Sequence, residues 1–177
     1  MSSRFIRLNR LYNILKESID FENAQAVPIK TNTDTRVNIE GLDVGIRIEQ
    51  FPNEEYKVYL PPNTILYKNF NPKTYYNLGF DISDLTTQTF KSDYKTLSKI
   101  LGIIVKSTLN WIKQNKPDVL TILPDASSDK EFERKISIYA SILNNNESLL
   151  NSMGYSWDKG KIFNGKLGLF IKKKLLK

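Results

Sequence analysis

Residues 105–143 read VKSTLNWIKQNKPDVLTILPDASSDKEFERKISIYASIL, and this stretch decides the fold class. Its apolar residues recur at helical spacing up to Lys116, and Pro117 ends the pattern. The next residues, DVLTILP (118–124), form a short apolar run of strand type. Helical spacing then returns, and Ser128 and Glu131 have the spacing of a capping box. The stretch therefore predicts a helix, a strand and a second helix in succession.

The first of these helices begins well before residue 105. Its apolar spacing continues back to Ser92, which predicts a helix over residues 92–116, the longest in the chain. The second helix carries an apolar stripe that includes a tyrosine. The stripe residues are Leu97, Ile100, Leu101, Ile104, Val105, Leu109, Trp111 and Ile112 in the first helix, and Phe132, Ile136, Tyr139, Ala140 and Leu143 in the second.

Four segments before the long helix alternate apolar and polar residues, as strands do. They are VGIRIEQF (44–51), YKVYL (56–60), TILYKNF (64–70) and YYNLGFDI (75–82). Short connections rich in Pro and Asn separate them, which favours an antiparallel meander. The strand within 118–124 is expected to join the same sheet. The residues from about Asn23 to Asn38 are predicted to be polar and turn-rich.

The C-terminal part is predicted to add two strands, GYSW (154–157) and KLGLFIKKKL (166–175), after asparagines 144–146 interrupt the second helix. The predicted fold class is α+β, a mixed α/β architecture in a single domain of residues 1–177. An N-terminal amphipathic helix and a turn-rich arm occupy residues 1–40. Residues 41–177 contain the antiparallel meander continued by a central strand, the two packing helices and the C-terminal strand pair.

The composition restricts the chemistry that the chain can perform. The sequence has no cysteine and no histidine, which excludes disulfides, thiol nucleophiles and the commonest general base and metal ligand. No acidic cluster has calcium-loop spacing, and we expect no cofactor and no metal. No apolar run approaches the ~20 residues that cross a bilayer, and the start of the sequence has no uninterrupted apolar h-region. We expect a protein of the virion or host cytoplasm, without an export signal of its own and without a membrane partner.

The order of elements resembles the GNAT acetyltransferase fold, and more narrowly small phage-encoded proteins of that shape. The resemblance covers roughly residues 75–160 and rests on the long helix, the Lys-Pro pair before the apolar strand, Tyr139 within the second helix, and Gly154–Tyr155 at the next strand. It implies a GNAT-like fold.

The resemblance also implies a coenzyme site at the start of the long helix. In that family backbone N–H groups of a Gly-rich turn hold the acetyl-CoA pyrophosphate there. Here the turn reads QTFKSDYKTL (88–97), and although Gln88 suits its first position, Lys91 and Asp93 replace the two small residues. Asp93 would also bring negative charge next to phosphate. The acetyl-CoA pyrophosphate motif is therefore missing.

Tyr139 has two interpretations. In acetyltransferases of this kind such a tyrosine protonates a leaving thiolate, so Tyr139 is the catalytic residue if the protein is an enzyme, with Asp81 or Glu49 as the base. Tyr139 also lies on the apolar stripe of its helix, and a core tyrosine with a satisfied hydroxyl is the commoner case. Core packing is the preferred interpretation, and we expect no catalytic residue.

Basic residues gather near both ends of the sequence, whose formal net charge is +7. Three arginines recur at every third residue along one face of the predicted N-terminal helix, and four lysines lie in the last six residues. Each set is either a solvated surface or a contact with phosphates or a partner's carboxylates. These candidate contact residues are Arg4, Arg7, Arg10, Lys172, Lys173, Lys174 and Lys177.

The favoured functional hypothesis is a non-catalytic structural or assembly protein of a bacteriophage, such as a head, neck or connector ring subunit. Its grounds are the missing Gly-rich turn, the absent His and Cys, and a preference for Lys and Asn that is typical of AT-rich coding sequences. The expected partners are other phage structural proteins and further copies of the chain. Two alternatives remain. One is an atypical acyl-CoA-dependent acyltransferase, and the other is a basic nucleic-acid-binding accessory protein whose ends contact DNA.

Overall fold

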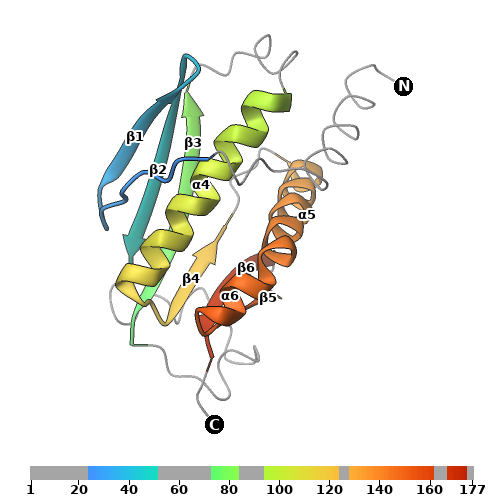
Figure 1. Cartoon of the computed structure of the whole chain (residues 1–177). Helices are drawn as coiled ribbons and strands as arrows, with labels where there is room; N and C mark the ends of the chain where they lie inside the picture. Colours follow the sequence, from blue (N-terminus) through green and yellow to red (C-terminus); the bar gives the residue numbers. More distant parts are fainter. Residues whose placement is uncertain (1–23, 52–72, 84–93, 124–127, 162–166, 175–177) are drawn as a thin grey trace.

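The computed structural model describes residues 24–51, 73–83, 94–123, 128–161 and 167–174. Within these ranges the protein is a mixed α+β structure, in which six strands form one mostly antiparallel sheet and three helices lie over one face of it (Figure 1). The predicted α+β class is confirmed at this level. The strands are β1 (Asp34–Ile39), β2 (Leu42–Gln50), β3 (Tyr75–Ser83), β4 (Val119–Ile122), β5 (Tyr155–Lys161) and β6 (Leu167–Lys173), and the helices are α4 (Tyr94–Asn115), α5 (Asp129–Asn145) and α6 (Glu147–Ser152).

Both long helices form where the apolar spacing predicts them. The capping box is present at the start of α5, where the Ser128 hydroxyl accepts a hydrogen bond from the Glu131 N–H at 3.2 Å. The interruption that three asparagines predict is narrower than expected, because only Asn146 lies outside a helix. Its side-chain amide donates to the Ile142 carbonyl at 2.8 Å and so satisfies one of the free carbonyls at the end of α5.

The sheet has the strand order β1-β2-β3-β4-β6-β5. β1, β2 and β3 are antiparallel neighbours, and β4 pairs with β3 in parallel after the crossover through α4. β6 lies between β4 and β5 and is antiparallel to both. The predicted pairing of the strand after Pro117 with the meander is therefore confirmed. The strands expected at 56–60 and 64–70 lie outside the described residues, as does the predicted N-terminal helix.

β1 corrects the expected turn-rich stretch between Asn23 and Asn38. Residues 34–39 form an edge strand that pairs along its whole length with β2. Glu40 and Gly41 connect the two strands with φ angles of 52° and 86°, as in the two-residue turns that suit hairpins. An edge strand with one exposed face needs few apolar residues, and β1 has only Val37 and Ile39. This polar composition explains why the strand pattern is weak.

The core lies between the helices and the sheet. Val44, Ile46 and Ile48 of β2 alternate with polar residues and are fully buried beneath the helices. The helix-facing residues of β3, β4 and β6 continue the same layer, and Trp111 packs edge-on against Tyr76 with ring centroids 4.9 Å apart.

The segment before β1 crosses the outer side of α4 (Figure 1). The Ser107 hydroxyl accepts from the Val27 N–H at 2.8 Å, and the Lys106 ammonium donates to the Ala24 carbonyl at 2.8 Å. Farther along the helix, the Trp111 indole donates to the Thr31 hydroxyl at 3.2 Å. These contacts explain why α4 carries buried residues on the side that faces away from the sheet as well as on the side that faces it.

Candidate functional site

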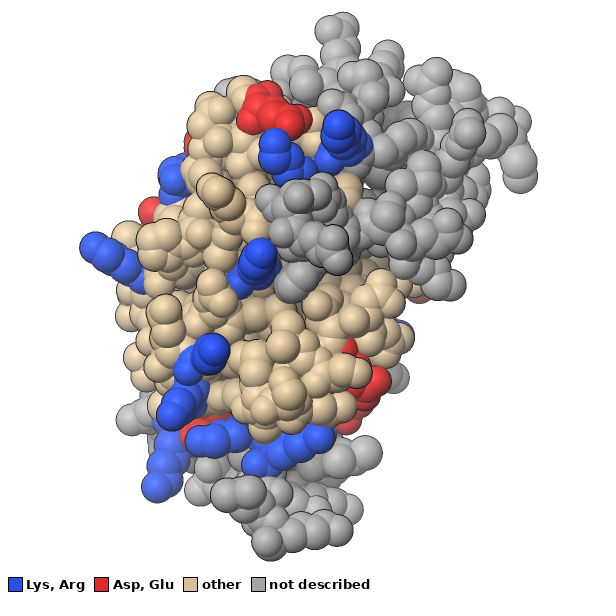
Figure 2. Space-filling view, in the orientation of Figure 1, with Lys and Arg blue, Asp and Glu red and all other residues tan. Residues whose placement is uncertain are grey.

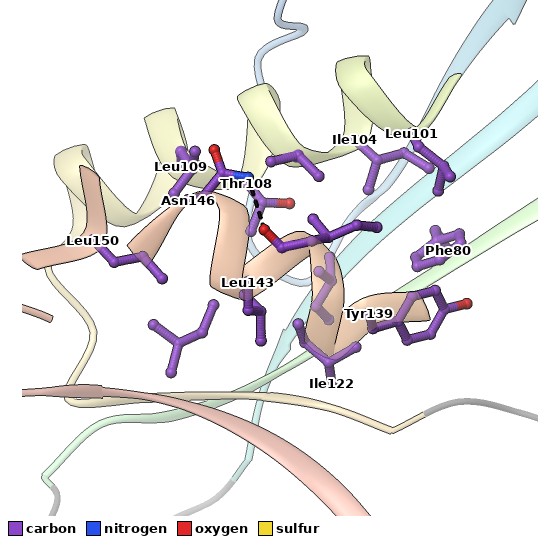
Figure 3. A pocket seen from close by; sticks show the side chains of 14 residues that line it. Phe80, Leu101, Ile104, Thr108, Leu109, Ile122, Tyr139, Leu143, Asn146 and Leu150 are labelled. Carbon is purple, nitrogen blue, oxygen red and sulfur yellow. Dashed lines mark hydrogen bonds between the residues drawn. The ribbon is translucent and has the colours of Figure 1, made fainter. Parts of the chain in front are cut away.

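An apolar pocket lies between α4, α5, α6 and the helix-facing side of the sheet (Figure 3). Its empty space is about 50 Å³. Most of the lining is aliphatic, and none of the described lining residues is acidic or basic. The lining residues are Leu78, Phe80, Leu101, Ile104, Val105, Thr108, Leu109, Ile122, Tyr139, Ile142, Leu143, Asn146, Leu150 and Ile171.

The unequal lengths of β3 and β4 position this pocket. β4 pairs with β3 only from Tyr75 to Leu78, whereas β3 continues to Ser83. Phe80 therefore lies beyond the part of β3 that pairs with β4, although it still pairs with Ile46 of β2, and its ring faces α5 (Figure 3). Tyr139 of α5 occupies this place, with its ring centroid 5.4 Å from that of Phe80 and the ring planes tilted by 65°.

Tyr139 is a partly buried residue at one end of the pocket. Burial, and to a smaller degree the Glu131 carboxylate, raises the pKa of Tyr139 far above its ordinary value, so the hydroxyl remains protonated at neutral pH. Its ring packs against the hydrophobic core, as the core interpretation predicts. A satisfied hydroxyl is not found, however, because no described residue forms a hydrogen bond with it.

Thr108 of α4 is the second unusual group in the pocket. Its side chain is 5% exposed, and its hydroxyl oxygen is buried without a hydrogen-bond partner among the described residues. Figure 3 shows the side chain projecting from α4 into the space towards α5. Sequence reasoning missed Thr108, although a signal was present: it follows Leu101 and Ile104 by seven and four residues, on the same apolar face of the helix.

The structure does not bring Tyr139 together with either carboxylate considered as its base. Asp81 follows Phe80 in β3 and lies opposite Gly45 of β2, on the face of the sheet away from the helices. Glu49 follows the buried Ile48 and is exposed on that same outer face. The sheet therefore separates both carboxylates from the pocket.

Asp81 belongs instead to a charged cluster centred on Arg36, which we call the Arg36 cluster. The Arg36 guanidinium donates to Asp34 at 3.0 Å, to Asp43 at 3.1 Å and to Asp81 at 3.0 Å. The hydrogen bonds with Asp34 and then Asp81 raise the pKa of Arg36 above its usual range. With three carboxylates around one guanidinium, the Arg36 cluster carries a formal charge of −2 on an otherwise basic protein.

The expected contact residues at the chain ends are described only in part. Lys172 forms an ion pair with Asp158 at 3.4 Å, while Lys173 and Lys174 are exposed after it. Lys177, Arg4, Arg7 and Arg10 lie outside the described residues, and so does most of the turn with Gln88, Lys91 and Asp93. On the face that carries the helices, basic side chains border a largely uncharged surface (Figure 2).

Within the described ranges, no group of three or more acidic side chains has an arrangement that could hold a metal ion. No described helix has the length and apolar character that are needed to span a membrane.

Comparisons of this chain with protein-family models, with curated proteins and with solved structures found no match.

Proposed function

We propose that this chain is a non-catalytic assembly protein of a bacteriophage particle, which uses a GNAT-like sheet and its helices as a scaffold. One observation carries the proposal. Among the described residues that line the apolar pocket on the helix side of the sheet, Tyr139 is the one with an acidic proton, and the sheet separates it from Asp81 and Glu49. General acid–base catalysis needs such groups within hydrogen-bond reach of one substrate.

The chain order of the elements supports the GNAT-like part of the proposal. An antiparallel unit, a long crossover helix, a parallel central strand, a second helix with an internal tyrosine and a final strand pair follow one another as the resemblance implies. Fold alone does not determine function, so the proposal rests on the separated groups and not on this order.

The assembly role predicts a defined oligomer, with the basic chain ends as contacts to neighbouring subunits. Native mass spectrometry of the full chain, over a range of protein concentrations and salt, should give one stoichiometry. The matched variant replaces Arg4, Arg7 and Arg10 by Lys, which preserves the net charge but removes the forked donors. We expect it to assemble less tightly by about 1–3 kcal/mol per engaged arginine. A chain that remains monomeric at every concentration would contradict the assembly role.

An atypical acyltransferase is the second candidate, because the Tyr139 hydroxyl is protonated and has no described hydrogen-bond partner. Calorimetry with acetyl-CoA separates the two functions. The assembly role predicts no binding in the low micromolar range. Such affinity requires about 8 kcal/mol, which a turn with Lys91 and Asp93 in place of the two small residues should not provide. Binding in that range, together with acetyl transfer that Tyr139→Phe abolishes, would favour the enzyme.

A further inference from the structure

The helix-side pocket has walls that suit an uncharged ligand. The described residues that line it include no carboxylate, ammonium or guanidinium group. A charged ligand would lose its hydration there without gaining an ionic partner. The aliphatic side chains of α4, α5 and β4 instead offer close contacts to an alkyl chain.

Thr108 provides one polar group within these walls. Its hydroxyl is buried and has no partner among the described residues, although buried hydroxyls are normally hydrogen-bonded. Of the other polar lining residues, Asn146 already uses its amide nitrogen on the Ile142 carbonyl. The Tyr139 hydroxyl points away from Thr108 (Figure 3). A ligand bound next to Thr108 would therefore find the unpartnered hydroxyl of Thr108 for its hydrogen bond.

Water fits this place poorly. The space of about 50 Å³ would accept more than one water molecule, since each needs about 10–15 Å³. A buried water usually makes about three hydrogen bonds, however, and the mostly aliphatic walls offer few polar partners besides Thr108. A short alcohol places its alkyl chain against these walls and needs only one hydrogen bond for its oxygen.

We propose that the pocket next to Thr108 binds a small, uncharged aliphatic molecule with a single hydrogen-bonding oxygen, such as a short primary alcohol. The volume sets the size. An apolar cavity of about 150 Å³ accommodates the six carbons of benzene, so a space of about 50 Å³ suits roughly two carbons, as in ethanol. This inference does not depend on the assembly role, since a scaffold and an enzyme could both contain such a site.

The test is a titration of the full chain with ethanol, followed by NMR of the methyl groups of Ile, Leu and Val. We expect saturable shifts of the Ile104, Leu143 and Leu150 methyl signals. Acetate, which has the same chain length but carries a charge, should cause no saturable shift. Xenon, which is apolar and has no hydrogen-bonding group, should enter the pocket of the wild type and of Thr108→Val equally well.

Three substitutions at one position test the role of the hydroxyl. Thr108→Val keeps the shape and removes the oxygen, and should weaken ethanol binding about fivefold, the effect of one neutral hydrogen bond. Thr108→Ser keeps the oxygen and should retain the preference for ethanol over acetate. Thr108→Leu fills the space and should abolish binding.

Two results would overturn the proposal. One is the absence of saturable shifts at the pocket methyls with ethanol, which includes the case of small, unsaturable shifts spread over the whole protein. The other is equal ethanol affinity of the wild type and Thr108→Val. If Thr108→Leu does not fold, the comparison of the Val and Ser variants still decides the question.

Discussion

The rings of Phe80 and Tyr139 meet edge to face, with centroids 5.4 Å apart, and join α5 to the part of β3 that extends beyond β4. Aromatic pairs of this geometry contribute about 0.5–1.5 kcal/mol beyond the area that they bury. The ring of Tyr139 therefore has a structural role whether or not its hydroxyl takes part in chemistry.

Substitutions of Tyr139 separate the ring from the hydroxyl. Tyr139→Phe should change the free energy of unfolding by less than about 1 kcal/mol, because the hydroxyl has no described hydrogen bond to lose. Tyr139→Ala should destabilise by about 3 kcal/mol or more, since it removes the Phe80 contact and leaves a cavity. Urea unfolding of the three proteins measures both effects. Loss of a function in the Phe variant with unchanged stability would indicate chemistry at the hydroxyl.

Two buried threonines form a matched pair for testing the unsatisfied hydroxyl. Thr121 of β4 is fully buried, and its hydroxyl lies 3.1 Å from both the Tyr76 carbonyl and the Asn77 side-chain oxygen. Thr108 has no such partner. Thr121→Val should therefore destabilise by about 1–2 kcal/mol, whereas Thr108→Val should stabilise by about 1 kcal/mol. Equal destabilisation by both changes would show that Thr108 is satisfied in solution.

Helices and central strands of this fold were predictable because their signals are local. Positions 94–115 and 129–145 have strong 3.6-residue periodicity, and Ser128 provides a side-chain cap that is visible in the sequence. β4 is an apolar run between two helices, so its central place follows from the connection rules. Tyr139 was identified through its stripe, and its partly buried ring bears out the packing part of that interpretation.

Features that depend on distant partners were not predictable. β1 is a strand because β2 pairs with it, and its own residues are mostly polar. Ser107 is buried because the segment around Val27 crosses α4, at a separation of 80 residues. Nor does the sequence show that β6, and not β5, borders β4, since both have strand-like patterns. The unpartnered state of Thr108 is likewise a property of the packed helices.

Two glycines on the outer face of the sheet test the Arg36 cluster. A Cβ at Gly45 would lie 2.5 Å from the Asp81 carboxylate and 2.9 Å from the Arg36 guanidinium, whereas a Cβ at Gly79 would meet nothing within 4 Å. Gly45→Ala should thus displace the cluster and destabilise by about 1 kcal/mol. Gly79→Ala should be neutral or stabilise by about 0.4–1 kcal/mol through the unfolded state.

A double-mutant cycle identifies the cause of the Gly45 effect. In an Asp81→Ala background the nearest contact is gone, so Gly45→Ala should be less harmful than in the wild type. Urea unfolding of the four proteins gives the coupling. An unchanged penalty would mean that the backbone at position 45, and not the charged cluster, resists a side chain.

Stability at alkaline pH should depend on Tyr155. Its hydroxyl donates to the Pro117 carbonyl at 2.9 Å and so joins the start of β5 to the connection between α4 and β4. Burial, with a smaller effect of the Asp118 carboxylate, raises the pKa of Tyr155 to about 12, from an ordinary value of 10.0. Between these values the unfolded chain has already released this proton while the folded protein still holds it. The free energy of unfolding must therefore fall as the pH rises from about 10 to about 12, and the contribution is fully present below pH 10.

Removal of the hydroxyl in Tyr155→Phe should flatten this decline, although the variant is less stable at neutral pH because the Pro117 carbonyl loses its donor. Burial also raises the pKa of Tyr139, so this residue should make the free energy of unfolding fall with rising pH as well. Part of the fall should therefore remain in Tyr155→Phe. The double variant that also contains Tyr139→Phe should show a still smaller fall. Urea unfolding between pH 8 and pH 11.5 gives the slopes for the wild type and the three variants. Identical slopes for the wild type and Tyr155→Phe would show that Tyr155 has the same pKa in the folded and unfolded states. Its hydrogen bond to Pro117 would then contribute nothing to the pH dependence of stability.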